Sequence, residues 1–203
     1  MGRLGEYLGK QCGNPTGIVG KIMTWGMNRV NKFMYKGIID EIKPNKQMVM
    51  LDIGFGNGFL EKLIYKRVHC NIYGIDISED MLNIALHKNC VGVKNGDIEL
   101  SIGDCCDLVF ENDTFDVVTT MNTIYFWNDT LKGLQEIHRT LKDGGTFCNA
   151  VLSKEYLKKV FYTKNVFKFF DKEDYISLGK QAGFKNITIK ELKKSCYLVI
   201  YSK

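Results

Sequence analysis

Three glycines at alternate positions, Gly54, Gly56 and Gly58, follow an apolar run that ends at Asp52. The stretch MLDIGFGNGFLEKL, residues 50–63, predicts a strand, a tight turn and a helix. Glycine allows left-handed backbone conformations and a close approach of a ligand, because it has no Cβ. Turns of this kind bind NAD, ATP or S-adenosylmethionine, and these cofactors imply different chemistries.

The spacing of the glycines separates these cofactors. The dinucleotide pattern G-x-G-x-x-G needs its third glycine five positions after the first, where this chain has Phe59. The P-loop pattern needs G-K-[ST] after the turn, and that is missing too. What is left is D-x-G-x-G-x-G, from Asp52 to Gly58.

Polar residues end the following predicted strands. Asp76, in YGIDIS, ends the next strand, where a carboxylate can accept hydrogen bonds from both hydroxyls of a ribose. The third strand ends at Asp104 in GDCCDL, and the fourth ends at Asn122 in FDVVTTMN. The turn LKDGGTF leads into a fifth strand. Chemistry-bearing residues therefore recur at one edge of the predicted sheet.

From residue 47 onward the pattern alternates between strands and helices, which predicts a parallel sheet covered on both faces. Ser78 is the predicted N-cap of a helix, and Gly144 and Gly145 are predicted to stop another. The expected strands are 47–53, 71–77, 98–104, 115–122 and 146–152, followed by a hairpin of 185–192 and 195–203. The expected helices are 59–68, 79–89, 130–141 and 172–184, with two short helices within 17–43.

The order of these features strongly resembles that in the class I S-adenosylmethionine-dependent methyltransferases. The features are the glycine turn, the acids at the strand ends, the F-D-V-V strand and the L-K-D-G-G turn. The resemblance covers roughly residues 47–152, and NTIYFWND (122–129) resembles the small-molecule, quinone-biosynthesis-like branch. It implies an α/β fold, a Rossmann-like doubly wound sheet of seven mostly parallel strands with an antiparallel C-terminal strand. We expect one domain over 1–203, made of a helical lid (1–44), a cofactor-binding core (45–152) and C-terminal helices with a β-hairpin (153–203).

The resemblance also implies roles for the motif residues. The glycine turn would pass the methionine part of the cofactor, and Asp52 would hold its amino group. Asp76 would bind the ribose, and Asp104 would accept from the adenine amino group. Each acid also has an alternative role that involves no cofactor. Asp52 could cap the turn, Asp76 could cap a helix, and Asp104 could be a turn residue. The residues assigned to S-adenosyl-L-methionine are Asp52, Gly54, Gly56, Gly58, Asp76, Ile77, Asp104, Cys105 and Met121.

The candidate catalytic residues are Asn122, Tyr125 and Trp127, which follow the fourth strand. Methyl transfer is an in-line displacement in which proximity supplies much of the rate, so a dedicated base is optional. DNA adenine methyltransferases carry N-P-P-Y at this place, and both prolines are missing here. We therefore expect a small-molecule acceptor and no nucleic acid. The alternative for the two aromatic residues is a buried aromatic cluster.

The N-terminal segment is expected to cover the cofactor. GNPTG (13–17) is a polar loop suited to a lid, and Trp25, Met27, Asn28 and Tyr35 could line an acceptor pocket. The alternative is a pair of packing helices without substrate contact.

Composition limits the remaining possibilities. The chain has 203 residues, a formal charge of +5 and seven cysteines without a zinc-type or disulfide-type spacing, so no metal is expected. The lysine-rich stretch 153–172 is interpreted as a solvated face. No apolar run suits a signal peptide or a membrane span, and we expect a cytoplasmic protein, monomeric or dimeric, without stable membrane insertion. The functional alternatives are a non-catalytic S-adenosylmethionine-binding module and a nucleic-acid methyltransferase.

Overall fold

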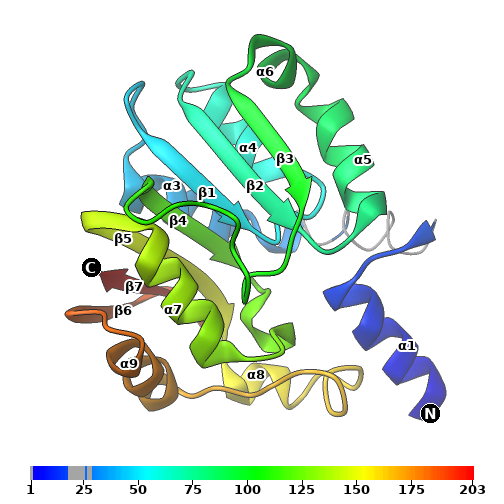
Figure 1. The fold of residues 1–203 in the computed structure, drawn as a ribbon. Helices are drawn as coiled ribbons and strands as arrows, with labels where there is room; N and C mark the ends of the chain where they lie inside the picture. The colour runs from blue at the N-terminus through cyan, green and yellow to red at the C-terminus, as the bar shows by residue number, and fades with distance from the viewer. Residues whose placement is uncertain (1, 18–25, 27–28) are drawn as a thin grey trace.

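One seven-stranded sheet forms the centre of the protein in a computed structural model, which describes residues 2–17, 26 and 29–203 (Figure 1). The strand order is β3-β2-β1-β4-β5-β7-β6. All neighbouring strands pair in parallel except β7, which is antiparallel to both β5 and β6. The strands are β1 Val49–Ile53, β2 Asn71–Asp76, β3 Ile98–Ile102, β4 Phe115–Met121, β5 Leu141–Leu152, β6 Asn186–Lys193 and β7 Cys196–Ser202. The predicted fold class and its antiparallel last strand are confirmed.

Helices cover both faces of this sheet. Apolar residues of α3, α4 and α5 pack in one core cluster, and those of α7 and α9 pack in a second cluster on the other face (Figure 1). The helices are α1 Gly2–Gly13, α3 Lys32–Ile42, α4 Phe59–Tyr65, α5 Glu79–Lys88, α6 Cys90–Asn95, α7 Thr130–Thr140, α8 Lys154–Leu157 and α9 Lys172–Gln181, with a 3-10 turn η1 at Ile124–Phe126. None of the helices that the structure describes is long and apolar enough to cross a bilayer.

The order of strands reverses between β1 and β4. The chain moves outward from β1 to β2 and β3, then returns to the other side of β1 with β4. In open parallel sheets the crevice at such a reversal, beyond the carboxyl ends of the strands, is where ligands bind. Both the glycine turn after β1 and the stretch NTIYFWND after β4 lie at this edge.

Several predicted boundaries hold, and others need correction. Ser78 caps α5 as predicted, with its side chain accepting from the Met81 N–H at 3.4 Å. The prediction that Gly144 and Gly145 stop α7 is wrong, because α7 already ends at Thr140. Residues 141–145 begin β5 instead. Leu141 pairs with Phe115 of β4, and after a register shift the pairing with β4 resumes at Thr146 and Val117. A local glycine rule cannot detect such pairing.

The N-terminal region also differs from the expectation. The second of the two helices expected within 17–43 is α3, while the first falls largely on residues 18–25 and 27–28, outside the described part. Helices α1 and α6 were not predicted, because α1 contains four glycines and α6 spans only six residues.

Gly58 shows why a glycine follows the turn at the start of α4. Its φ is +70°, a left-handed value that favours glycine. A Cβ at this position would lie 2.5 Å from Asn89 Nδ2 and 2.8 Å from Ala85 Cβ, so α5 packs directly against it. The Asn89 side chain also donates to the Gly58 carbonyl oxygen at 2.9 Å. This glycine is explained by packing between helices.

We predict that Gly58→Ala lowers the free energy of unfolding by about 2 to 4 kcal/mol, because a left-handed alanine costs about 1 kcal/mol and overpacking adds about 1 to 3 kcal/mol. Gly96→Ala is the matched control, since Gly96 has φ +78° with open space around it, and it should lose only about 1 kcal/mol. Urea unfolding measures both. Equal losses in the two variants would show that α5 does not constrain Gly58.

Candidate functional site

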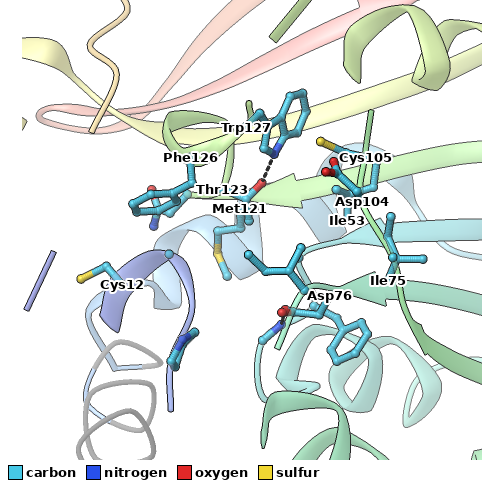
Figure 2. A pocket seen from close by; sticks show the side chains of 18 of the residues that line it. Cys12, Ile53, Ile75, Asp76, Asp104, Cys105, Met121, Thr123, Phe126 and Trp127 are labelled. Atoms are coloured by element: carbon cyan, nitrogen blue, oxygen red, sulfur yellow. Dashed lines mark hydrogen bonds between the residues drawn. The ribbon is translucent and has the colours of Figure 1, made fainter. Parts of the chain in front are cut away.

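A pocket opens at the carboxyl ends of β1 and β4, where the order of strands reverses (Figure 2). Its walls come from the glycine turn, the ends of β2, β3 and β4, and the N-terminal segment. Nine of the residues predicted for the site line it: Gly54, Gly56, Asp76, Ile77, Asp104, Cys105, Met121, Asn122 and Trp127. Asp52, Gly58 and Tyr125 do not line it, although they were predicted with the others.

The glycine turn presents bare backbone to this pocket. Gly54 and Gly56 have φ values of +72° and +54°, so both adopt the left-handed conformation. A Cβ on Gly54 would strike the Thr123 side chain, whereas a Cβ on Gly56 would meet nothing within 4 Å. The space beside Gly56 is therefore open on the pocket side. It can receive a ligand that lies flat against the chain.

Asp76 faces this turn from the end of β2 (Figure 2). Its carboxylate accepts from the Gly56 N–H at 2.8 Å and from the Ser78 N–H at 2.9 Å. Burial raises the pKa of Asp76, and these backbone donors offset part of that effect. The residue does not cap α5, because Ser78 does. Each oxygen keeps a lone pair for a further donor from the pocket.

Ile77, Asp104 and Cys105 form the wall of the pocket at the ends of β2 and β3. Ile77 is 51% exposed, an apolar side chain open to a flat ring. Asp104 accepts from the Cys106 N–H at 2.9 Å, so it does act as a turn residue, and it is exposed. Its remaining oxygen can still accept from a ligand.

Asp104, Cys105 and Cys106 are also the one group of possible metal ligands in the described part of the chain. The Sγ atoms of the two cysteines are 3.9 Å apart. Burial and the neighbouring thiol raise the pKa of Cys105 well above its usual range, which keeps it protonated. Metals bind the thiolate, so this group is poorly suited to a metal.

The end of β4 holds polar groups at the other wall. Asn122 has φ +58°, an uncommon value for a residue with a side chain. Its Nδ2 lies 3.4 Å from Asn31 Oδ1 and 3.3 Å from Met34 Sδ. The contact with Asn31 is long and the thioether sulfur of Met34 is a weak acceptor, so the amide can exchange them for a better acceptor.

Thr123 and Trp127 complete this wall (Figure 2). The Trp127 indole N–H donates to the Thr123 hydroxyl at 3.1 Å, and that hydroxyl also bonds the hydroxyl of Thr120. Thr120 in turn donates to the Ile53 carbonyl oxygen at 2.6 Å. This chain of hydrogen bonds connects the end of β1 to the indole ring and holds the ring at the pocket.

Tyr125 lies behind the pocket instead of lining it. It is 1% exposed, and its ring stacks on Phe167 at 5.4 Å. Its hydroxyl accepts from the Leu152 N–H at 2.6 Å and lies 3.4 Å from Asn122 Oδ1. This placement favours the alternative of a buried aromatic residue, which supports Asn122 from behind.

Two buried carboxyl groups lie outside the lining of the pocket. Asp52 accepts from the Thr119 hydroxyl at 2.5 Å, and burial raises its pKa to about 6. Glu61, on α4, is fully buried, and neither of its carboxyl oxygens has a hydrogen-bond partner among the described residues. Burial, followed by the charge of Asp52, raises the pKa of Glu61 well above its usual value. Asp52 and Glu61 therefore form an acidic pair of buried carboxyl groups below the turn.

The N-terminal segment closes the side of the pocket that faces β2. The Pro15 carbonyl oxygen accepts from the Ser78 hydroxyl at 2.7 Å, and the Gly17 N–H donates to Asp80 at 2.8 Å. Gly13 packs against the ring of Phe126, because a Cβ there would lie 2.7 Å from that ring. The segment is thus attached to both walls.

Several lining residues were missed by the sequence reasoning. Thr123 and Phe126 lie inside NTIYFWND, so only their individual contacts were unforeseen. Asn31 and Cys12 carry no motif that could have revealed them. Tyr35 lines the pocket as expected, whereas Trp25, Met27 and Asn28 lie outside the described residues.

Comparison with known proteins decides the family. A family model described as a methyltransferase domain matches residues 51–149. The chain is 31% identical over 166 residues to 2-methyl-6-phytyl-1,4-hydroquinone methyltransferase 2 of Oryza sativa subsp. japonica, a match that covers 78% of this chain and 46% of that protein. It is 29% identical over 126 residues to the ubiquinone/menaquinone biosynthesis C-methyltransferase UbiE of Geotalea daltonii, covering 62% of this chain and 53% of that one.

Among solved structures, phosphoethanolamine N-methyltransferase 2 of Haemonchus contortus, in complex with S-adenosyl-L-methionine, is similar with a TM-score of 0.67 and 25% identity. That match covers 77% of this chain and 38% of the other. The chain belongs to the class I S-adenosylmethionine-dependent methyltransferases. The domain spans about half the length of the plant relatives that it matches.

The pocket of this methyltransferase domain fits the family's cofactor, S-adenosyl-L-methionine. The open space at Gly56 suits the close approach of the methionine part, and the buried Asp76 suits the ribose hydroxyls. Ile77 offers an apolar face to the adenine. The pocket lining contains two carboxylates and no lysine or arginine among the described residues, which favours a ligand with a sulfonium and an ammonium group.

We predict that the acidic pair makes the domain lose stability as pH rises. A carboxyl group whose pKa is raised on folding stabilises the protein at pH values below its pKa in the unfolded chain, near 4. That contribution is lost as pH rises through the pKa in the folded protein, which is about 6 for Asp52 and well above the usual value for Glu61.

Glu61→Gln removes one charge of the pair, so its free energy of unfolding relative to the unmodified protein should increase between pH 4 and pH 8. Glu173→Gln is the control, since Glu173 is exposed on α9, and its difference in free energy of unfolding should not change with pH. Urea unfolding across this range measures both. A pH-independent difference for Glu61→Gln would contradict the raised pKa.

Proposed function

We propose that the protein is an S-adenosylmethionine-dependent methyltransferase that transfers a methyl group to a small-molecule acceptor by in-line displacement. We propose further that the acceptor is a largely apolar aromatic compound of the hydroquinone type. The observation that carries this proposal is the lining of the pocket, which combines the glycine turn and Asp76 with the aromatic side chains of Phe126 and Trp127 and has no lysine or arginine among the described residues.

The chemistry of the pocket favours this acceptor over a phosphorylated one. Relatives of this chain include both quinone-type and phosphoethanolamine methyltransferases. A phosphate group needs cationic donors, and no lysine or arginine lines the pocket in the described part of the chain. An apolar ring with one or two hydroxyl groups instead needs aromatic walls and a few polar atoms.

In the proposed cofactor half of the pocket, the chain supplies position and charge. S-adenosylmethionine, when bound, provides an electrophilic methyl group on a sulfonium. Gly54 and Gly56 offer backbone without a side chain, and Asp76 accepts from the ribose hydroxyls. Asp104 and the Cys105 N–H are positioned for the adenine edge, and Met121 for the sulfonium. Asp52 would act on the amino group only indirectly, because it does not line the pocket.

In the acceptor half, Asn122 is the proposed polar contact. Its Nδ2 makes a long contact with Asn31 and a contact with the weak thioether acceptor of Met34, so it can donate to an acceptor hydroxyl. Trp127 is fixed by its bond to Thr123 and can pack on the acceptor ring. Tyr125 would position Asn122 without touching the acceptor. Holding the acceptor in line with the methyl group then supplies most of the acceleration.

The N-terminal segment is proposed as a lid over this pocket, as the division into a lid (1–44) and a core (45–152) predicts. Cys12, Gly13 and Pro15 line the pocket, and Pro15 is bonded to Ser78 beside Asp76. A segment placed in this way excludes water from the reacting groups, which strengthens their electrostatic interactions.

We predict that Asp76→Ala weakens binding of S-adenosylhomocysteine by about 1 to 3 kcal/mol, because charge-assisted hydrogen bonds to the ribose are lost. Asp107→Ala is the control, since Asp107 is exposed and does not line the pocket. Titration calorimetry measures both affinities. Unchanged affinity in Asp76→Ala would contradict the role of Asp76 at the ribose. If the unmodified protein did not bind S-adenosylhomocysteine, the proposed function would be contradicted.

We predict transfer of labelled methyl from S-adenosylmethionine to a prenylated hydroquinone, and a drop in turnover of roughly tenfold in Asn122→Gly, which loses about one hydrogen bond. Glycine is chosen because it keeps the left-handed backbone at this position. The affinity for S-adenosylhomocysteine should stay unchanged, which separates the acceptor role from cofactor binding.

The same assay decides between the alternatives. Cofactor binding without transfer to any phenol, quinone, amine or thiol would favour a non-catalytic binding module. Transfer to total RNA or DNA in place of the small molecules would favour a nucleic-acid methyltransferase.

A further inference from the structure

The outer surface of α3, α4 and the end of α5 is strongly positive. Two grooves run along this surface, one between α3 and α4 and one between α4 and the α5–α6 corner. The lysines and arginines that line them define the basic face: Arg29, Lys32, Lys36, Lys62, Lys66, Arg67 and Lys88. In Figure 1 these helices lie on the side of the sheet opposite α7 and α9.

The cations of the basic face make no ion pair with any described residue. Within the described residues none of the seven forms an ion pair, whereas lysines elsewhere do, such as Lys154 with Asp171 and Lys190 with Glu41. Burial lowers the pKa of Lys88 to about 8; the charge of Glu61 opposes this, and the charge of Lys62 adds a smaller lowering. Seven cations thus line two adjoining grooves without an ion pair among the described residues, and an anionic surface would supply the missing counter-charge.

Apolar side chains are interspersed with these charges. Val30 is 68% exposed and Phe33 is 47% exposed, and both lie within two residues of Lys32 on the chain. The groove between α3 and α4 has Ile39, Phe59 and Leu63 in its lining. Cations combined with exposed apolar side chains are typical of surfaces that lie in the headgroup region of a bilayer.

The basic face adjoins the candidate active site. Tyr35 lines both the groove between α3 and α4 and the methyltransferase pocket, and it is the one residue that the two linings share in the described part of the chain. Asn31 lines the pocket while its neighbours Val30 and Lys32 are exposed. A surface that rests on α3 would therefore lie next to the pocket.

We propose that the basic face docks the protein reversibly on an anionic lipid bilayer, with the pocket beside the membrane surface. The docking follows from the charges and the exposed apolar side chains, and it does not depend on the identity of the acceptor. Were the acceptor lipophilic, it could pass between bilayer and pocket over a short distance.

A bilayer fits this face better than a nucleic acid does. Proteins that bind single strands offer aromatic rings on which bases stack. Here Tyr35 is buried, Phe59 lies under the Lys88 ammonium at 5.6 Å, and Tyr65 is already stacked on His69 at 4.3 Å. Phe33, the more exposed ring, lies under the Lys193 ammonium, 4.4 Å from the ring centroid. The rings of this face therefore already have partners.

The test is sedimentation of the full chain with vesicles of phosphatidylcholine alone or with 30% phosphatidylglycerol, without acceptor. We expect binding only to the anionic vesicles, and its loss at high salt, because the attraction is screened. A triple variant, Lys32→Gln with Lys36→Gln and Lys62→Gln, should weaken partitioning on the order of a hundredfold, about fivefold per lysine.

The matched control removes the same charge elsewhere, with Lys46→Gln, Lys180→Gln and Lys185→Gln, three exposed lysines outside the basic face. It should partition within about threefold of the unmodified protein, since charges beyond a Debye length of the bilayer are screened. Cofactor affinity should be unchanged in both variants, which separates docking from the proposed function. Equal losses in both triple variants, no binding to anionic vesicles, or tighter retention on RNA than on vesicles would each overturn the proposal.

Discussion

The hydrogen bond from the Gly56 N–H to the Asp76 carboxylate is the interaction on which the site depends. It connects the turn after β1 to the end of β2, while the Gly54 N–H donates to the Ile75 carbonyl oxygen at 2.7 Å beside it. Gly54 and Gly56 both have left-handed backbone in this turn, a conformation that favours glycine. The turn then directs α4 away from the pocket and leaves the carboxyl ends of β1 and β4 open to a ligand.

The three equally spaced glycines of the turn are required for different physical reasons. Gly54 leaves room for Thr123, Gly58 leaves room for α5, and only at Gly56 does the missing side chain open space toward the pocket. A regular sequence motif thus combines two packing requirements with one ligand requirement. Substitution at each position should accordingly affect a different property, stability at the outer two and affinity at the middle one.

The order of elements and most of the pocket could be predicted from the sequence, because both depend on local patterns. Strand ends are marked by Asp76, Asp104 and Asn122, and parallel strands bring their carboxyl ends to one edge. The burial of Tyr125 and the exclusion of Asp52 from the lining could not be predicted, since they depend on contacts with Leu152 and Thr119, which are far away in sequence. The start of β5 at Leu141 was missed for the same reason.

The charges of the molecule are segregated in a way that links its two surfaces. The pocket contains carboxylates and no lysine or arginine, and the basic face contains seven cations without a paired acid, in both cases among the described residues. Tyr35 stands between them, and the buried carboxyl groups of Glu61 and Asp52 raise its pKa further after burial has already raised it. A cationic cofactor is thereby favoured on one side of this ring and an anionic surface on the other. A cation at the basic face, or an anion in the pocket, would be repelled by the like charges there.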